Sequence, residues 1–354
     1  MALEDFRLAV EAITGGKNTV LYDDLGQPSV MVKWAAQNNK DILTGGTDQT
    51  HPGSLVEGTS KLFYVSKYKN IVVNGRAISL PGQDPASWVN ADQALNYCRA
   101  KGKGWGPVPY ALRAQIALWC RKNGTMPHGN TNFGCDGDHP YEKGLVTYVD
   151  GTHAGGRTAT GSGPATWNHN WLPDGISDLC GNQSEWTPDF RMKNGELQFI
   201  PYANIMDPDV SNSADSTAWK ALNASGEFVD PGSDGTLKYD WISGKGIQLT
   251  NGSLTFTEDA NNGTLYERLL LNSGISSVPE MASALMIYPD EPGGDYGGDL
   301  HYINTTGERI ARVGGDWGLG SYAGVFCVYL SGPRSNSYAN VGFRSAYCDL
   351  SSSS

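Results

Sequence analysis

The sequence has few charged residues and no cluster of basic ones. Charged residues make up 18% of the chain, and 26 Lys and Arg stand against 37 Asp and Glu, so the net charge is -11. Binding to nucleic acid needs a basic patch that neutralises phosphates, so this composition argues against a nucleic-acid partner. The sequence also lacks an apolar run near the roughly 20 residues that span a bilayer, so we expect no insertion into a membrane.

Cysteines are few and widely spaced, and none forms a Cys-x-x-Cys pair. Residues 1–16 show neither the basic region nor the apolar region of a signal peptide. Both observations favour free thiols, while a bridge between Cys98 and Cys348 is the alternative in an oxidising compartment. The six cysteines are Cys98, Cys120, Cys135, Cys180, Cys327 and Cys348.

Glycine and aromatic residues are abundant instead. The chain has 354 residues, with 45 Gly, 17 Tyr and 10 Trp. The aromatic side chains can bury enough area to offset the conformational entropy of the chain. The composition therefore indicates a loop-rich globular protein, with one large domain or two of ordinary size.

Residues 1–60 are expected to form a separate N-terminal segment that serves docking or oligomerisation. Apolar residues repeat at helical spacing between Leu3 and Ile13, and Gly15-Gly16 ends this helix. Residues 28–34 read as a strand, because the run is apolar and β-branched.

Strand and helix patterns follow between residues 61 and 123. Residues 61–78 read as strands with an Asn-Gly turn at residues 74–75. Helices are expected at residues 90–100 and 110–122, and Asn123-Gly124 closes the second. The mixture predicts an α+β fold.

Most of the chain between residues 124 and 300 is expected to be irregular. Residues 124–175 are rich in Gly, Asn, Asp, Thr and Pro, which predicts long loops. Residues 190–300 read as an insertion, with a strand pair around Asn194-Gly195 and a brief helix at residues 265–271. Residues 351–354 read as a polar tail.

The most informative stretch is residues 312–344. Two anchors, Gly314-Gly315-x-Trp317 and Gly342-Phe343-Arg344, enclose a short strand. Strand side chains alternate between two faces, and we expect one face in the core and the other outward. The inward face holds Phe326, Val328 and Leu330, and the outward face holds Cys327, Tyr329 and Ser331.

A second motif and the same two anchors carry a family resemblance. The run Asp178-Leu179-Cys180-Gly181-Asn182-Gln183-Ser184-Glu185-Trp186-Thr187 looks like the D-x-x-G-N-x-x-E-W-T motif of the formylglycine-generating-enzyme (sulfatase-modifying-factor) branch of the C-type lectin fold. The helix ending at Tyr97-Cys98 and the helix around residues 114–119 match that branch in order. The resemblance implies a C-type lectin domain over residues 61–350, with the insertion inside it.

Within that branch the chain looks closest to the variable proteins of diversity-generating retroelements. Their variable region alternates short motifs that do not vary, called fixed words below, with positions where template Asn codons are miscopied. The fixed words survive here as Gly320-Ser321, residues 323–326, residues 334–337 and residues 342–344. Randomising both adenines of an Asn codon cannot yield Trp, Lys, Gln, Glu or Met, and none of these occurs at the variable positions. Asn340 reads as a further variable position, at which the Asn of the template was retained.

The resemblance implies ten variable positions that bind ligand and seven scaffold positions that hold the shape. The variable positions are Asp316, Gly318, Leu319, Tyr322, Cys327, Tyr329, Ser331, Gly332, Tyr338 and Ala339. The scaffold positions are Trp186, Gly314, Gly315, Trp317, Gly342, Phe343 and Arg344. We expect the aromatic scaffold residues in the core and Arg344 as a buried strut whose five donors satisfy carbonyls.

These positions predict a non-enzymatic protein that recognises a macromolecule on a cell surface or a host receptor. Surfaces rich in Tyr, Ser and Gly are what antibody paratopes use, which makes Tyr322, Tyr329 and Tyr338 the candidate anchors. The resemblance implies a phage or prophage protein, placed on a virion tail or acting as an adhesin on a bacterial surface. An alternative without ligand specificity is a structural tail or assembly protein.

Enzymatic and metal-binding alternatives arise from the same family. Its oxidases use a copper-binding cysteine pair, and Leu319 and Gly324 stand at those positions here, which disfavours an oxidase. Relatives of the second motif can hold calcium, which would place a calcium ion at Asn182 and Glu185. The alternative is a turn cap at Asn182 and an ion pair between Glu185 and Arg344. A zinc site at His128, Cys135 and His139 fits no closed spacing well.

Overall fold

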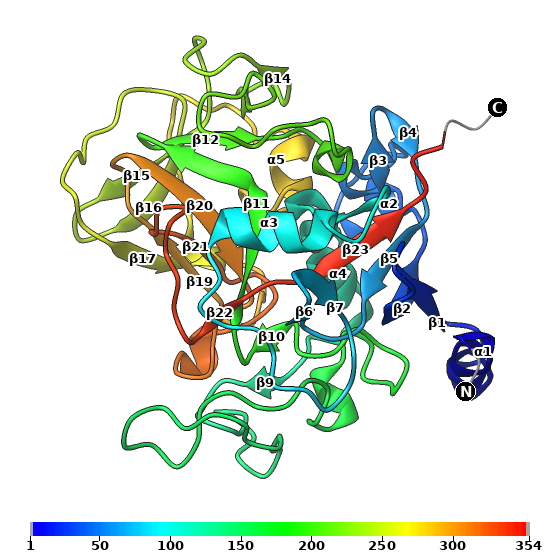
Figure 1. Ribbon diagram of the computed structural model, residues 1–354. Helices are drawn as coiled ribbons and strands as arrows, with labels where there is room; N and C mark the ends of the chain where they lie inside the picture. Colours follow the sequence, from blue (N-terminus) through cyan, green and yellow to red (C-terminus); the bar gives the residue numbers. More distant parts are fainter. Residues whose placement is uncertain (1–2, 352–354) are drawn as a thin grey trace.

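The computed structural model describes residues 3–351, so residues 352–354 of the expected polar tail lie outside it. The described chain has two large sheets (Figure 1), and side chains from both belong to one buried cluster. Within residues 3–351 the helices are α1 (Leu3–Thr14), α2 (Asn39–Ile42), α3 (Ala91–Arg99), α4 (Tyr110–Asn123) and α5 (Glu280–Ala284). In that same range no helix has the length and apolar character needed to cross a membrane.

The smaller sheet joins the N-terminal segment to the C-terminus of the described chain. Its strands, in spatial order, are β1 (Asn18–Tyr22), β2 (Pro28–Trp34), β5 (Phe63–Ser66), β23 (Ser345–Cys348) and β8 (Trp105–Pro107). A boundary at residue 60 therefore falls between paired strands, because β2 and β5 are neighbours in one sheet. Helix α1 projects at the edge of this sheet beside β1 (Figure 1).

The larger sheet contains the strands of the informative C-terminal stretch. Its main path, in spatial order, is β17 (Asn262–Leu265), β19 (Leu300–Ile303), β21 (Val328–Leu330), β20 (Glu308–Val313), β11 (Ser184–Lys193), β12 (Glu196–Phe199), β15 (Lys238–Ile242), β16 (Gly246–Thr250) and β18 (Leu270–Leu271). The branches are β13 (Lys220–Leu222), β14 (Phe228–Val229) and β22 (Val341–Gly342). Residues 190–300 thus extend the sheet that carries the C-terminal strands.

Short elements complete the described chain. The remaining strands are β3 (Leu55–Val56), β4 (Thr59–Ser60), β6 (Ile71–Val73), β7 (Arg76–Ile78), β9 (Gly129–Asn130) and β10 (Cys180–Gly181). The 3-10 turns are η1 (Pro52–Ser54), η2 (Ala165–Trp167), η3 (Asn204–Met206), η4 (Tyr266–Arg268) and η5 (Gly320–Tyr322). The helix expected at residues 265–271 is the single turn η4, because β17 and β18 take the residues on either side.

Local signals explain why the helices lie where the sequence predicts. Asn90 caps α3: its Oδ1 accepts a hydrogen bond from the Gln93 N–H at 2.9 Å, and Gln93 Oε1 accepts one from the Asn90 N–H at 3.0 Å. Helix α4 ends at Gly124, whose φ of +66° is the left-handed C-cap that glycine favours. Side chains of α4 pack with strands of both sheets in one buried cluster, so α4 joins the two sheets.

Candidate ligand-binding surface

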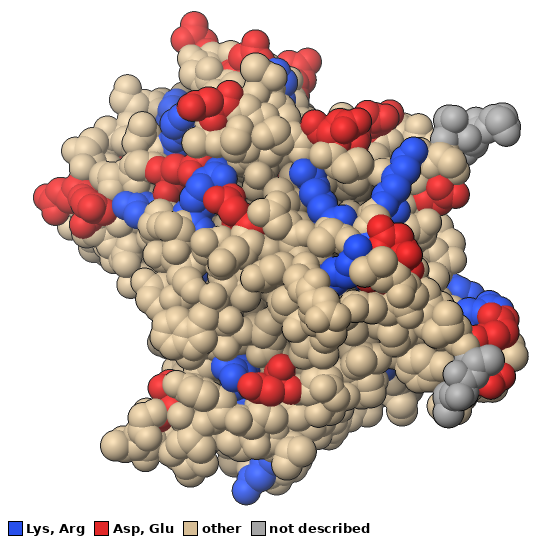
Figure 2. Space-filling view, viewed as in Figure 1, with Lys and Arg blue, Asp and Glu red and all other residues tan. Residues whose placement is uncertain are grey.

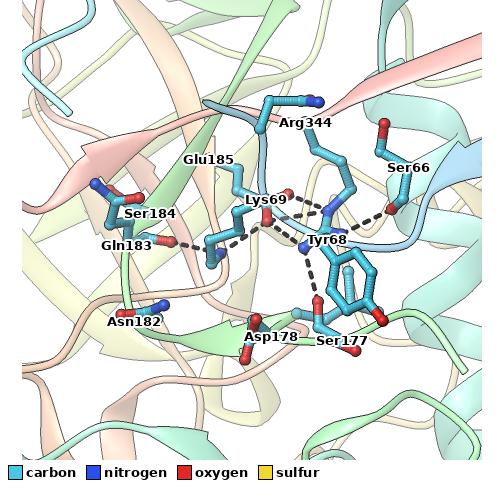
Figure 3. A network of polar contacts seen from close by, with 12 residues as sticks. Ser66, Tyr68, Lys69, Ser177, Asp178, Asn182, Gln183, Ser184, Glu185 and Arg344 are labelled. Carbon is cyan, nitrogen blue, oxygen red and sulfur yellow. Dashed lines mark hydrogen bonds and ion pairs between the residues drawn. The ribbon is translucent and has the colours of Figure 1, made fainter. Parts of the chain in front are cut away.

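The base of the C-terminal ribbon, residues 308–348, is fixed by buried ion pairs (Figure 3). Arg344 is buried and donates to the carbonyl oxygens of Ser66 at 2.8 Å, Lys67 at 3.0 Å and Ser177 at 2.8 Å. Its Nη2 also lies 2.8 Å from Glu185 Oε1, which is the ion pair considered as the alternative to calcium, and the buried guanidinium acts as a strut. One guanidinium therefore joins three separate segments of chain behind β22 and β23.

Glu185 has a second buried partner, because Lys69 Nζ lies 2.7 Å from its Oε1 and donates to the Gln183 carbonyl at 2.8 Å. Burial by itself raises the pKa of Glu185, but the charges of Arg344, Lys69 and Arg113 outweigh it and lower that pKa to about 2. Glu185 is thus ionised and fully engaged at neutral pH.

Asn182 is engaged as well, and the calcium expectation finds no support in the geometry. Its Oδ1 accepts from the Thr158 N–H at 2.9 Å, and its Nδ2 donates to the Thr158 carbonyl at 3.0 Å. The alternative, a turn position at Asn182 and an ion pair at Glu185, describes the structure. Across residues 3–351, no group of three His, Cys, Asp or Glu side chains is arranged to hold a metal ion.

A tight turn at Gly314-Gly315 shapes the first loop of the ribbon, residues 314–325. A Cβ on Gly315 would lie 2.5 Å from the Cβ of Ala323, and its φ is +70°. Trp317 follows the turn and is buried, as expected, with its Nε1 donating to Asp150 Oδ2 at 3.0 Å. The Trp317 carbonyl also accepts a hydrogen bond from the Phe133 N–H at 2.8 Å, so the backbone of this loop contacts the long loop at residues 130–157.

The second loop of the ribbon, residues 331–340, is held through its backbone and through Arg334. The Ala339 carbonyl accepts from Arg157 and from Gln183, each at 3.2 Å. Arg334, part of a fixed word, bonds Glu308 through its Nε at 2.8 Å and Asp92 through its Nη1 at 2.9 Å. These contacts fix the chain without using the side chains at most of the variable positions.

One pair of side chains joins the two loops directly. Asp316 Oδ2 accepts a hydrogen bond from Asn340 Nδ2 at 2.8 Å, and Asp316 Oδ1 accepts the Gly318 N–H at 3.0 Å. Burial raises the pKa of Asp316. The two loops therefore form one continuous surface rather than two independent ones.

Most variable positions lie at the surface of the ribbon, although the three tyrosines make no ring contact with one another among the described residues. Tyr322 is 51% exposed and Tyr338 is 47% exposed. By burial of the whole residue, the ten positions fall into three groups. They are the exposed Gly318, Tyr322 and Tyr338, the half-buried Asp316, Leu319, Tyr329, Ser331 and Ala339, and the buried Cys327 and Gly332. Figure 2 shows that the surface around β22 carries few charged side chains.

The expectation that Cys327 faces outward is wrong. Its side chain is fully buried. Strand β21 begins only at Val328, and the Cys327 N–H closes a turn on the Gly324 carbonyl at 3.1 Å, so the alternation of the strand does not reach Cys327. Burial raises the pKa of the Cys327 thiol well above its ordinary value. Cys327 and the buried Gly332 are therefore core positions of the ribbon, not contact positions.

Tyr329 does follow the predicted alternation and belongs to a row of side chains across the sheet. Its neighbours in register are Tyr302 on β19 and Arg312 on β20, and Trp186 on β11 lies next to Arg312. The Tyr302 and Tyr329 rings meet edge to face, with centroids 5.7 Å apart. The Arg312 guanidinium lies 5.3 Å from the Tyr329 ring and 5.4 Å from the Trp186 ring.

Sequence reasoning missed Tyr302, Arg312 and Trp88 as members of this surface. Tyr302 comes from the region read as an insertion, so only strand pairing brings it beside Tyr329. Trp88 is 62% exposed, and its N–H donates to the Tyr338 carbonyl at 3.0 Å. The local sequence offered one indication of Trp88, because a tryptophan in a loop that contains Pro and Ser is often exposed.

The remaining scaffold residues and cysteines behave as core. Trp186 and Phe343 are buried, as expected, and so are Gly314, Gly315 and Gly342. All six cysteines lie within the described residues and are free thiols, including Cys98 and Cys348. At the weighed zinc site, His128 and His139 stack with ring centroids 4.0 Å apart and each bonds a carboxylate, while the Cys135 thiol bonds the Asn132 carbonyl.

Comparison with known proteins gives distant likenesses only. No protein-family model matches the chain, and no curated protein matches it. Among solved structures it is similar to variable protein 1 of Treponema denticola, at 13% identity and a TM-score of 0.34, over 93% of this chain and 98% of that one. It is similar to PvdO from Pseudomonas aeruginosa, at 15% identity and a TM-score of 0.31, over 93% and 97% of the two chains.

A third likeness is to the P3c variant of the Major Tropism Determinant, at 12% identity and a TM-score of 0.25, over 90% of this chain and 63% of that one. Of these three structures, two are named for variability or tropism and one, PvdO, is not. At these scores the likeness carries no argument about function. A functional conclusion has to come from the residues of this chain.

Proposed function

We propose that this protein binds a macromolecular ligand without chemical reaction, through the exposed side chains of the C-terminal ribbon on a C-type lectin scaffold of the formylglycine-generating-enzyme type. The observation that carries the proposal is that different residues within 308–348 hold the backbone in place and form the surface. Backbone atoms and buried side chains such as Arg344 and Trp317 hold the ribbon, while the variable side chains, apart from Cys327 and Gly332, lie at its surface.

A surface built in this way tolerates changes of side chain. Exposed substitutions away from buried networks usually change stability by no more than about 0.5 kcal/mol. The ribbon loops are pinned by contacts to carbonyls, as at Ala339, and by fixed residues, as at Arg334. New side chains at Tyr322, Tyr338 or Gly318 would therefore alter the ligand-facing surface and leave the fold intact. Diversification in a retroelement, with a phage tail or a bacterial surface as the place of action, accords with this arrangement.

The thiols support a binding role over an oxidase role. A thiol acts as a nucleophile or a copper ligand in its deprotonated form. Burial raises the pKa of Cys120 and of Cys348 to about 12, and it raises those of Cys180 and Cys327 well above the ordinary value. In the metal-free chain these four thiols are protonated at neutral pH. The stronger observation is that the positions of the oxidase cysteine pair hold Leu319 and Gly324.

The binding proposal is tested by truncating the three tyrosines together. A variant with Tyr322, Tyr329 and Tyr338 changed to Ala is screened beside the unmodified protein against purified bacterial envelope fractions immobilised on a sensor surface. Aromatic anchors of an interface lose roughly 1 to 2 kcal/mol each on truncation when they are central. We expect the triple variant to bind any fraction that the unmodified protein binds at least tenfold more weakly.

A matched control removes three tyrosines from elsewhere on the molecule. Tyr22 on β1 and Tyr64 on β5 are half-buried on the smaller sheet, and Tyr141 is 77% exposed on the long loop. Changing these three to Ala removes the same chemistry far along the chain from the ribbon loops, so binding should stay within about twofold. Equal binding by the ribbon variant and the unmodified protein would contradict the proposal.

Related copies of the chain provide a second prediction. Sibling sequences should differ at the exposed and half-buried variable positions and hardly elsewhere. Burial restricts two of the ten: Cys327 and Gly332 should vary only among small side chains, and a new Cβ at Gly332 would require the end of the Asn336 side chain to move aside. Sequencing siblings, together with any Asn-rich template repeat, checks this. Differences spread evenly along the chain would refute diversification.

A further inference from the structure

A cleft of about 630 Å³ opens beside the first loop of the ribbon. Its walls come from the end of α4, from residues 126–139, from residues 295–299 and from residues 320–325. Ser321 lies at its border and is exposed, and the next residue along the chain is Tyr322. The cleft is therefore contiguous with the proposed ligand-binding surface but is built mainly from residues outside the variable positions.

A nearly buried carboxyl group reaches this cleft. Asp299 is 2% exposed and lines the cleft. Its Oδ2 accepts the Phe326 N–H at 2.7 Å, and its Oδ1 has no hydrogen-bond partner among residues 3–351. A Cβ on Gly324 would lie 2.1 Å from that Oδ1, so glycine is what allows the carboxyl group to sit there. Oδ1 is not one of the fully buried atoms without a partner, so it is the oxygen that meets the cleft, where water or a ligand can bind it.

The charges around Asp299 leave it without a counter-ion. Burial chiefly raises the pKa of Asp299, to about 8, with the Phe326 hydrogen bond and Arg113 opposing it and Glu267 and Asp295 adding to it. Below that pH the cleft, before a ligand binds, holds a neutral carboxyl group, so a cation that binds there displaces its proton, and binding should strengthen as the pH rises toward 8. Arg121, one of the two cations of the cleft wall, is already engaged by the carboxylates of Asp290 and Glu291. The cleft wall has four Asp residues and only two basic ones, so it favours a cation. These are Asp136, Asp138, Asp295 and Asp299, with Arg121 and Lys122.

The other walls suit a hydrocarbon stem and a positive charge. Met126, Pro127 and Val325 provide apolar contact. The stacked rings of His128 and His139, with Trp171 5.9 Å from His128, line one side. Aromatic faces attract cations, and apolar walls accept the methylene groups that precede an ammonium or guanidinium.

We propose that this cleft binds the side chain of a lysine or arginine of the macromolecular ligand, with the Asp299 carboxylate as its counter-charge. This inference rests on the proposed function and adds to it a fixed pocket that would serve every variant of the ribbon. The variable side chains then decide which ligand is bound, and the pocket supplies an anchor that does not change.

The probe is the blocked peptide acetyl-Ala-Ala-Lys-Ala-Ala-amide, titrated into the full chain and followed by NMR or calorimetry. Its partner probe carries Nε-acetyl-lysine, which keeps the stem and removes the charge. We expect the charged peptide to bind in the millimolar range and the acetylated one at least tenfold more weakly. Equal binding of the two, or no binding of the charged peptide at 20 mM, would overturn the proposal. Tighter binding of n-pentylamine than of the peptide would overturn the assignment to a polypeptide.

Two variants locate the binding. Asp299→Asn keeps a carbonyl oxygen for the Phe326 N–H but removes the charge, and it should weaken the charged peptide at least tenfold. Ser321→Trp fills the border of the cleft from an exposed position, so it tests the same site even if Asp299→Asn fails to fold. An unaltered affinity in both variants would place the peptide elsewhere and end the proposal.

The outcome for the cleft is separable from the outcome for the ribbon. The variant with three tyrosines changed to Ala should still bind the charged peptide, because none of those residues lines the cleft. Loss of peptide binding in Asp299→Asn alone supports the cleft. Loss of envelope binding in the tyrosine variant alone supports the ribbon surface.

Discussion

Replacing Arg344 by Met should lower the free energy of unfolding by about 3 to 5 kcal/mol, the cost typical of removing one partner of a buried ion pair. The change leaves Lys69 as the remaining ion-pair partner of the buried Glu185 and removes the donor for the carbonyls of Ser66, Lys67 and Ser177. Chemical denaturation followed by tryptophan fluorescence measures the difference. Because these carbonyls lie on separate segments, the loss should affect the whole fold cooperatively.

The control is an arginine with the same chemistry at the surface. Arg7 on α1 pairs with Glu4 and Glu11, and its side chain is 37% exposed. Exposed ion pairs contribute little to stability, so Arg7→Met should leave the midpoint of denaturant unfolding nearly unchanged. If the two variants lose equal stability, the buried network is not what fixes the ribbon.

The pH dependence of stability gives an independent reading of the same network. The pKa of Glu185 is lowered in the fold to about 2, whereas its ordinary value is 4.5. A depressed carboxyl pKa contributes stability that is complete above pH 4.5 and is lost as pH falls toward 2. Between those values the unmodified protein should lose stability more steeply than Arg344→Met, because that variant lacks the largest of the charges that lower the pKa of Glu185.

Features decided by neighbouring residues could be predicted from the sequence. The Asn74-Gly75 turn between β6 and β7, the cap at Asn90 and the helix end at Gly124 each depend on one or two residues and a known backbone preference. The sequence also allowed the pairing of Glu185 with Arg344 as an alternative. A buried carboxylate needs a cation, and one motif contains the carboxylate while the other contains the guanidinium.

Features decided by distant pairing could not be predicted. In the sequence, Phe326 and Cys327 continue the apolar alternation of β21. Only the hydrogen-bonded turn from Cys327 to Gly324 shows that the strand begins at Val328. Tyr302 joins the ligand-binding surface through the parallel pairing of β19 with β21, for which a sequence has no local mark. Asp299 is one acidic residue in a Gly-rich run, and its burial results from the approach of residues 324–326.

The strongest test of the division between shape and recognition compares two glycines three residues apart. Gly315→Ala should destabilise the protein by on the order of 3 kcal/mol, because φ at this position is +70° and the new Cβ would lie 2.5 Å from the Ala323 Cβ and 2.8 Å from its Cα. The obstacle is backbone and a Cβ, so a rotation of a side chain cannot relieve it. Denaturant unfolding reports the loss.

Gly318→Ala is the matched change at a variable position. Its Cβ would meet nothing closer than the Phe133 ring at 3.5 Å, and Gly318 is exposed, so stability should stay within about 0.5 kcal/mol. The two substitutions add the same methyl group to the same loop, and the proposed function requires them to differ. If Gly318→Ala were as damaging as Gly315→Ala, the loop could not accept new side chains without losing its shape, and a scaffold for diversified recognition would be untenable.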